Sequence, residues 1–445
     1  MNITDILNND GTLCACGKRH YALVSRAIIK EGAINDVPML VKEKGADSVF
    51  MYCDLNTYDV AGKKVEALLT DAGITVKKYV FPFREIFEPD EKAVGSAVMH
   101  YESCDMIIGV GTGVVNDVSK MVAATAEKPY MIVGTAPSMD GYASGTSSMV
   151  RDGLKCTLKT KCPDIVVGDL DVLCNAPIDM LRAGVGDMLA KYISICEWRI
   201  GAIIKGEFFC ETSAAIVREA LRKVVSLAPG LMSRDKEAVK AVMEGLVLSG
   251  IAANYAETTR AVSGGEHYFS HLWDMRSLDF GTPIHLHGIQ CGAATIDVMR
   301  AYEIIKRLTP DREKALAYVK AFDVEGYNEK LRKFVGSGSK QMIELEKKEK
   351  KYTVPEHEKR LDIIIENWDR IVSIINEEAP LCEALEAITV TEAPKCGAEL
   401  GKTNEVMAQT FVFSKDIRDK YVVSRLAFDI GVIDEVTTEL YGTTV

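Results

Sequence analysis

The sequence predicts an α/β domain with a parallel sheet, followed by a mainly α-helical domain. Short apolar runs typical of buried strands alternate with helical segments over the first 170 residues. From about residue 177 strand signals become rare, and glycines punctuate a long helical region. The 445 residues, 47% of them hydrophobic and 26% charged, have a globular composition and suffice for two to three domains.

The predicted elements of the first domain follow one another in regular order. Strands are expected at residues 48–53, 75–81, 106–110 and 130–133, and helices at 60–72, 90–101 and 115–126. Right-handed crossovers place the loops after parallel strands along one edge, so ligands are expected to bind there. Two extended pieces within residues 155–172 are expected to pair as a hairpin at the junction. We therefore divide the chain into an α/β domain, 1–172, and a helical domain, 173–445.

Composition and charge exclude several classes of protein. The chain has 53 basic and 64 acidic residues, and this net charge of -11 argues against general binding to nucleic acid or anionic membranes. No apolar run approaches the roughly 20 residues of a membrane span. The first ten residues, MNITDILNND, lack a basic segment followed by an apolar one, so no signal peptide is expected. We expect a cytoplasmic protein whose twelve cysteines are reduced.

A glycine-rich segment, Gly109–Lys120, follows a predicted buried strand and opens a predicted helix. Glycine lets the backbone approach a phosphate closely, and the amides of a helix start donate hydrogen bonds to it. The spacing is not G-x-G-x-x-G, and a plain strand-to-helix turn is the alternative. Asp54 ends an earlier strand, where a carboxylate either binds a ribose diol or, equally well, caps a helix.

A second loop, Thr135–Ser144, follows the predicted strand at 130–133 and therefore lies on the same edge as the glycine segment. It is rich in hydroxyl groups and carries one carboxylate, that of Asp140. Such a loop suits a polyol or the carboxamide of a nicotinamide. A turn of serines and Asp-Gly without further function is the alternative.

Histidines give the strongest chemical signal. Four of the seven fall between residues 267 and 287, where even scatter predicts less than one. His267 and His271 are four residues apart and share one face of a helix. His285 and His287 form a second pair, and periodicity cannot choose between them, since alternate residues of a strand face the same side. With Asp187, near a predicted helix start, two imidazoles form a binding set for a divalent transition metal.

A weaker cluster lies near the N-terminus. Cys14, Cys16 and His20 resemble half of a zinc site, but the sequence offers no second half at a suitable spacing. A hairpin turn with buried thiols is the favoured interpretation.

Five motifs occur in a fixed order along the chain. They are the glycine segment with Asp117 and Lys120, Ser138-x-Asp140-Gly-x-Ala-Ser144, Gly186-Asp187-x-Leu-Ala-Lys191, Gly265-Glu-His267-x-x-Ser-His271 and Leu286-His287-Gly-x-Gln290. Over roughly residues 45–300 this order resembles the sn-glycerol-1-phosphate dehydrogenases, within the iron-containing alcohol dehydrogenase and dehydroquinate synthase-like superfamily. The resemblance implies a Rossmann-like dinucleotide-binding domain and a helical metal-binding domain.

The resemblance also implies roles for individual residues. It places the metal on Asp187, His267 and His287, and the catalytic contacts with substrate on Asp140, Asp187 and His271. It places the cofactor on Asp54, Gly111, Thr112, Gly113, Val114, Val115, Thr135, Ser138 and Ser144. Val114 stands where the family commonly has an arginine, which leaves the preference between NAD and NADP open.

The activity that the resemblance implies is the reversible NAD(P)H-dependent reduction of dihydroxyacetone phosphate to sn-glycerol 1-phosphate. One Zn, Ni or Fe ion, a cleft between the domains and a homo-oligomer are expected. Lys155, Lys159, Lys161 and Arg260 are candidates to bind the substrate phosphate. The alternatives are a dehydrogenase of an unphosphorylated polyol such as glycerol, a dehydroquinate synthase-like lyase, and a binding role without catalysis.

Overall fold

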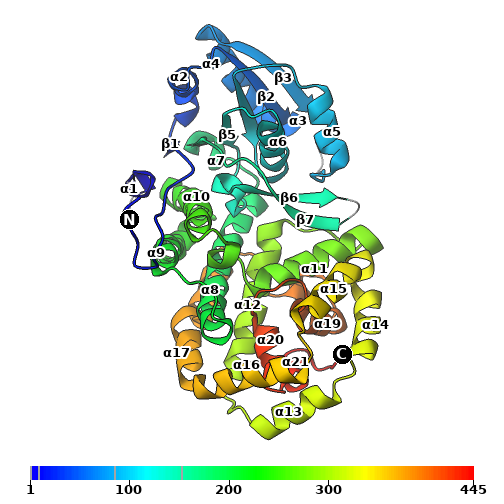
Figure 1. Ribbon diagram of the computed structural model, residues 1–445. Helices are drawn as coiled ribbons and strands as arrows, with labels where there is room; N and C mark the ends of the chain where they lie inside the picture. Colours follow the sequence, from blue (N-terminus) through cyan, green and yellow to red (C-terminus); the bar gives the residue numbers. More distant parts are fainter. Residues whose placement is uncertain (1–2, 9–10, 85–86, 152–153) are drawn as a thin grey trace. The chain divides into compact units, whose positions relative to one another are not determined.

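The computed structural model describes residues 3–8, 11–84, 87–151 and 154–445 (Figure 1). It contains two compact units, which we describe separately. Unit 1 comprises residues 1–188 and 212–258, and unit 2 comprises residues 189–211 and 259–445. These units are defined by contacts within the chain, whereas the predicted domains are defined by what they bind. The predicted domain boundary after residue 172 therefore stays a prediction.

Unit 1 is built on a six-stranded sheet whose pairings are all parallel, with the order β1-β8-β5-β4-β2-β3 (Figure 1). Its strands are β1 (Arg26–Lys30), β2 (Ser48–Asp54), β3 (Thr75–Phe81), β4 (Met106–Gly111), β5 (Tyr130–Gly134) and β8 (Ile165–Asp169). The four predicted strands correspond to β2, β3, β4 and β5, which confirms the α/β fold class. β1 was not predicted.

The prediction that the two extended pieces within residues 155–172 pair with each other is wrong. The second extended piece is β8, which lies between β5 and β1 in the parallel sheet. The first is β7 (Leu154–Lys159), which pairs instead with the preceding β6 (Thr146–Arg151) in a separate antiparallel pair. Every residue of β8 is buried, as expected for the interior of a parallel sheet covered on both faces.

Alternate residues of each strand point to opposite faces of the sheet, and helices pack on both faces. Val49, Met51 and Cys53 of β2 belong to one hydrophobic core with residues of α2 and α4, while Tyr52 faces α5 and donates its hydroxyl to the Ala97 carbonyl. The helices of unit 1 are α1 (Ile3–Leu7), α2 (Val37–Glu43), α3 (Leu55–Thr57), α4 (Lys63–Asp71), α5 (Glu91–Met99), α6 (Gly113–Thr125), α7 (Leu170–Leu173), α9 (Glu211–Leu227, without its first residue) and α10 (Lys236–Ala256).

Unit 2 is helical, and the described chain after residue 169 contains no strand. The mainly helical second half is therefore confirmed. The long helix α8 (Ile178–Lys205) contains the boundary at residues 188 and 189. The other helices are α11 (Gly265–Phe280), α12 (His287–Ile305), α13 (Arg312–Ala321), α14 (Val324–Val335), α15 (Ser339–Glu349), α16 (Val354–Glu366), α17 (Trp368–Glu378), α18 (Leu381–Val390), α19 (Asn404–Ser414), α20 (Val423–Asp429) and α21 (Ile433–Tyr441).

Buried charges fix the C-terminal helices of unit 2. Asp416 accepts hydrogen bonds from Arg425 at 2.7 Å and from the hydroxyl of Tyr327 at 2.6 Å. Asp429, at the end of α20, forms two hydrogen bonds with Arg360 at 2.9 and 3.0 Å. Such pairs satisfy charges that burial would otherwise make costly. Across the described residues, no helix is both long and apolar enough to cross a membrane.

Candidate active site

The predicted glycine segment joins β4 to α6 as expected. β4 ends at Gly111, and Thr112 caps the helix, its hydroxyl accepting the Gly113 amide at 2.6 Å. A Cβ on Gly111 would lie 2.7 Å from Cβ of Val115, so the turn excludes a side chain there. A Cβ on Gly113 would meet nothing closer than 3.9 Å. The first turn of α6 thus offers amides to an anion on a face that no side chain covers.

The hydroxyl-rich loop lies against this helix start. The Thr135 amide donates to the Gly111 carbonyl at 3.1 Å, and the hydroxyls of Thr112 and Ser138 lie 2.6 Å apart. Both segments were predicted to share an edge of the sheet, and the structure brings them together. Ser144 turns elsewhere, since its hydroxyl donates to the Thr146 carbonyl at 2.9 Å.

Two polar residues of the glycine motif hold this loop in place. Asn116 donates to the Gly141 carbonyl at 3.1 Å. Lys120 is fully buried and donates to the Thr146 carbonyl at 2.8 Å, and its ammonium lies 3.3 Å from Asp117. Burial raises the pKa of Asp117. We interpret these residues as supports that fix the loop to α6.

Asp54 ends β2 and caps the short helix α3. Its carboxylate accepts the Thr57 amide at 2.8 Å, and its own amide donates to the Thr57 hydroxyl at 3.0 Å. This reciprocal arrangement is a capping box. The helix-cap alternative is therefore confirmed, while binding of a ribose by Asp54 stays a prediction.

Asp187 and Asp140 are joined within unit 1. The Asp140 amide donates to Oδ2 of Asp187 at 2.9 Å, and Asp187 is fully buried on α8. One turn earlier on the same helix, a Cβ on Gly184 would collide with the Pro137 carbonyl. Glycine at this position therefore lets α8 approach the Thr135–Ser144 loop closely enough for the Asp187 carboxylate to bind it.

The predicted histidines meet within unit 2. The rings of His267 on α11 and His287 at the first position of α12 have centroids 5.0 Å apart. Nδ1 of His267 lies 2.7 Å from Glu266, and Nδ1 of His287 lies 3.1 Å from the Ser270 hydroxyl. When its Nδ1 is held in this way, a histidine presents Nε2 to a metal. The arrangement thus fits two oriented imidazole ligands.

Cys291, one turn after His287 on α12, was not predicted as part of this cluster. Its Sγ lies 3.6 Å from Nε2 of His287, and the donor atoms of His267, His287 and Cys291 all lie within 4.8 Å of one another. Its spacing of four residues from His287 on a helix is the signal that could have found it.

His271 and His285 take different places. The His271 ring centroid lies 6.4 Å from that of His267 and 6.3 Å from that of His287, consistent with one helical turn of separation. His285 precedes α12 in a segment without regular structure. Burial and the positive charge of Lys402 lower the pKa of His285. Since it precedes α12, His285 lies outside the helix that carries His287, and the choice of His287 over His285 as a metal ligand stays a prediction.

Two buried carboxylates that the sequence did not reveal hold the start of α11. Oε1 of Glu266 accepts the Gly264 amide at 2.7 Å in addition to its contact with His267. Glu197 accepts the Gly265 amide at 2.7 Å and the Val423 amide at 2.8 Å. Burial and the nearby charge of Glu266 raise the pKa of Glu197 to about 8. Together they fix the backbone that carries His267.

Two of the four candidates for the substrate phosphate are already engaged within the protein. Arg260 is buried, forms an ion pair with Glu207 and donates to the Tyr421 carbonyl at 3.1 Å. Lys161 lies 3.6 Å from Asp164. Lys155 and Lys159 lie on β7. A role for Arg260 in binding phosphate stays a prediction, and its ion pair with the partly exposed Glu207 counts against it.

Comparisons with known proteins identify relatives of this chain. A family profile described as iron-containing alcohol dehydrogenase matches residues 28–177. A glycerol-1-phosphate dehydrogenase for NAD(P)+ from Halalkalibacterium halodurans is 32% identical over 294 residues, which are 65% of this chain and 74% of the relative. The enzyme of that name from Bacillus subtilis is 30% identical over 66% of this chain and 77% of its own. The one from Methanosarcina mazei is 32% identical over 62% and 75%.

Solved structures show the same fold at lower identity. A glycerol dehydrogenase from Schizosaccharomyces pombe superposes with a TM-score of 0.57 at 16% identity and covers 94% of this chain and 90% of its own. An archaeal halo-thermophilic alcohol dehydrogenase from a Red Sea brine pool gives a TM-score of 0.59 at 12% identity over 95% and 98%. Both comparisons support the predicted architecture.

Proposed function

The chain belongs to the glycerol-1-phosphate dehydrogenase family of iron-containing alcohol dehydrogenases, and on this premise we propose that it reduces dihydroxyacetone phosphate to sn-glycerol 1-phosphate. The reaction is reversible and uses NADH or NADPH and one divalent ion, Zn, Ni or Fe. The observation that carries the proposal is the pair of imidazoles, His267 and His287, each with its Nδ1 held by a neighbour. Members of this family at about 30% identity are named for this activity.

We assign the metal to Asp187, His267 and His287. Two imidazole nitrogens and one carboxylate oxygen match the ligand preference of Zn²⁺, Ni²⁺ or Fe²⁺ and leave a position for substrate. When bound, the ion polarises the carbonyl oxygen of the substrate as a Lewis acid. The hydrogen bond from the Asp140 amide orients the Asp187 carboxylate, and Glu266 and Ser270 orient the two rings.

We assign the cofactor to the carboxyl edge of the sheet in unit 1. The open face of Gly113 and the amides that begin α6 suit a pyrophosphate, flanked by Gly111, Thr112, Val114 and Val115. The paired hydroxyls of Thr112 and Ser138, with Thr135, suit the polar edge of the nicotinamide half. Asp54 is assigned to the ribose. Ser144 carries the least support of this set, because its hydroxyl is used by the Thr146 carbonyl.

We assign the proton and the substrate hydroxyls to His271 and Asp140. Reduction of a ketone requires one proton at the oxygen that becomes the secondary hydroxyl, and a histidine near that oxygen supplies it. His271 stands one turn from His267, so it faces the same region without joining the ligand pair. Asp140 binds another hydroxyl of the substrate.

The decisive assay follows oxidation of NADH and of NADPH by absorbance, with dihydroxyacetone phosphate and with unphosphorylated dihydroxyacetone in parallel. We expect turnover with the phosphate ester at a kcat/KM well above that of dihydroxyacetone, restored by Zn²⁺, Ni²⁺ or Fe²⁺ after chelation. A preference for dihydroxyacetone would instead identify a polyol dehydrogenase. Turnover without net oxidation of the nicotinamide would identify a lyase.

A glycine variant tests the cofactor assignment separately. Gly113→Ala adds a methyl group where the protein itself has room, so folding is preserved while a pyrophosphate is displaced. We expect an increase in KM for NAD(P)H with an unchanged melting temperature. Gly95→Ala on α5 is the control, because a Cβ there meets nothing within 4 Å. An unchanged KM in Gly113→Ala would place the pyrophosphate elsewhere.

We propose that the enzyme acts in the cytoplasm on a small-molecule substrate. In support, all twelve cysteines lie in the described part of the chain and none forms a disulfide. A homo-oligomer is the assembly that the family resemblance predicts. Sedimentation of the purified protein tests that prediction.

A further inference from the structure

A second group of metal-type donors lies at the N-terminus of unit 1. Residues 13–19 form a small hairpin, in which Leu13 and Arg19 make an antiparallel bridge. The Cys14 amide donates to the Lys18 carbonyl at 2.8 Å, and the Gly17 amide donates to the Cys14 carbonyl at 2.9 Å. Gly17 has a φ of 85°, which glycine adopts readily. The predicted hairpin turn is thus confirmed, but its thiols are only half-buried.

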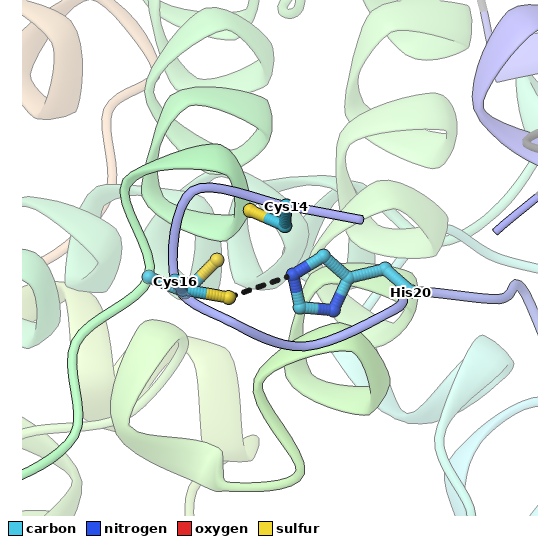
Figure 2. Close-up of side chains that lie close together, drawn as sticks. Cys14, Cys16 and His20 are labelled. Atoms are coloured by element: carbon cyan, nitrogen blue, oxygen red, sulfur yellow. Dashed lines mark hydrogen bonds between the residues drawn. The ribbon is translucent and has the colours of Figure 1, made fainter. Parts of the chain in front are cut away.

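The hairpin directs three donor groups toward one point (Figure 2). Sγ of Cys16 lies 3.3 Å from Nε2 of His20, and the donor atoms of Cys14, Cys16 and His20 all lie within 4.8 Å of one another. In a tetrahedral zinc site, bonds of about 2.0–2.3 Å separate neighbouring donors by about 3.5–3.8 Å. The three donors therefore need only a small adjustment to share one ion.

His20 is fixed in a ligand-like orientation. It is 3% exposed, and its ring stacks on that of Tyr255 of α10 at 5.0 Å and an interplanar angle of 8°. The Tyr255 hydroxyl is in turn held by the Ile6 carbonyl at 3.0 Å. This packing fixes the orientation of the ring before an ion binds, which is the effect that hydrogen-bonded neighbours have on other metal-binding imidazoles.

Apolar burial does little to fix the rest of the hairpin. Leu13, Tyr21 and Leu23 are 60%, 55% and 56% exposed, although each is a large apolar residue. Small loops that cannot bury a core are commonly fixed by a disulfide or by a metal. The hairpin is held by the ion pair between Lys18 and Glu257 and by hydrogen bonds, and it contains no disulfide. A metal bound to the cysteine and histidine donors would fix it further.

The position of Thr212 indicates a fourth donor. The Thr212 hydroxyl lies 3.1 Å from Sγ of Cys14, so the start of the segment 212–258 is in contact with the hairpin. Cys210 precedes Thr212 by two residues, and two residues of chain span at most about 7 Å. Its thiol is therefore within reach of the same point. The spacing along the sequence did not reveal this donor, because Cys210 lies far along the chain from the N-terminal hairpin.

We propose that the N-terminal hairpin binds a structural Zn²⁺ ion through Cys14, Cys16 and His20, with Cys210 as the fourth ligand. A closed set of three thiolates and one imidazole is typical of structural zinc and leaves no position for a substrate. This ion is separate from the one assigned to Asp187, His267 and His287. Its role is to fix the segment that leads into β1.

The test is a metal analysis of the full-length protein purified under reducing conditions in zinc-containing medium. We expect two equivalents of metal in the wild type, one in Cys16→Ser and one in His287→Ala. Cys382→Ser, at an exposed cysteine of α18, is the matched control and keeps two equivalents. Equal zinc contents in Cys16→Ser and the wild type would overturn the proposal. Failure of the proposed activity would leave this result unaffected.

Cobalt substitution tests the donor set without a variant. Co²⁺ bound to the wild type should show the intense thiolate charge-transfer absorption of a site with several sulfur ligands. Binding of Co²⁺ to the wild type without this absorption would overturn the proposal, even if Cys16→Ser failed to fold. A reduced charge-transfer intensity in Cys210→Ser would support the fourth ligand, and an unchanged intensity would remove Cys210 from the site.

Discussion

The two donor clusters of this protein are built in opposite ways. His267 and His287 stand on the long helices α11 and α12, and each ring is oriented by a neighbour, Glu266 or Ser270. Cys14 and Cys16 stand on a short hairpin with one backbone bridge and are half-exposed. In the first cluster, which we propose to bind the catalytic ion, the protein positions the ligands before the metal arrives. In the second, as we propose, the metal imposes its geometry on the protein.

This difference has a thermodynamic meaning. A catalytic site works best when its ligands are positioned before the ion and substrate arrive, because the cost of ordering them has then been met during folding. A structural ion instead contributes its binding free energy to folding itself. Loss of the first ion should therefore abolish activity and leave the fold intact, whereas loss of the second should weaken the fold and spare the chemistry.

The largest effect on activity is expected from removing an oriented imidazole. His287→Ala should lose the catalytic ion and reduce kcat/KM at least about 10³-fold, since a Lewis acid contributes several kcal/mol to the transition state. His285→Ala is the matched control, because that residue is the other member of the pair and precedes α12. Metal content and kcat/KM are measured on both. Metal that survives in His287→Ala and vanishes in His285→Ala would reverse the assignment.

His271→Ala should separate chemistry from metal binding. We expect a full complement of metal and a loss of about 30- to 1000-fold in kcat/KM, or about 2–4 kcal/mol, as for one positioned acid–base group. KM for the cofactor should change little, because the residues that we propose to bind the cofactor lie in unit 1. Loss of metal from this variant would make His271 a ligand and end the proposed division of roles.

Glu266→Gln tests whether the orientation of His267 matters. The substitution keeps the shape of a side chain that is fully buried, but removes the charge beside Nδ1 of His267. We expect the affinity for the catalytic ion to fall about 10- to 100-fold, measured by titration of the metal-free enzyme with activity as the readout. Activity at saturating metal should recover most of its wild-type value. Unchanged affinity would show that helix geometry alone positions the ring.

The smallest effect on activity is expected at the hairpin. Cys16→Ser should keep kcat/KM within about twofold of the wild type when the catalytic site is saturated, because a structural ion contributes to folding and supplies no catalytic group. Its melting temperature should be lower than that of Cys382→Ser. The two measurements are a thermal denaturation curve and the standard assay. A large loss of activity without a change in melting temperature would contradict the proposal that the hairpin ion contributes to folding and not to catalysis.

Local patterns in the sequence predicted most of the fold. β2, β4 and β5 were visible because each is a largely continuous apolar run, as buried parallel strands are. β3 was predicted although it lies at an edge of the sheet and contains Lys77 and Lys78. β1, with Arg26 and Lys30 at its ends, lies at the edge of the sheet and shows no such run. β8 was recognised as extended but given the wrong partner, because pairing depends on contacts between distant residues.

In the candidate site, too, local patterns revealed some residues, and contacts between distant segments hid others. His267, His271 and His287 were found because histidines are rare in this chain and clustered. Glu197 escaped notice because its contacts with the amides of Gly265 and Val423 join segments far apart in sequence. The sequence also did not show that Arg260 already has an anionic partner within the protein, Glu207.

The close approach of α8 to the Thr135–Ser144 loop couples two binding equilibria. Gly184 permits that approach, and the Asp140 amide then binds the Asp187 carboxylate. Under the proposed function, one loop carries a cofactor contact at Ser138 and the group that orients a metal ligand. Any cofactor-induced shift of this loop alters the free energy of metal binding. Linkage then requires the metal to change the dissociation constant of NAD(P)H by the same factor.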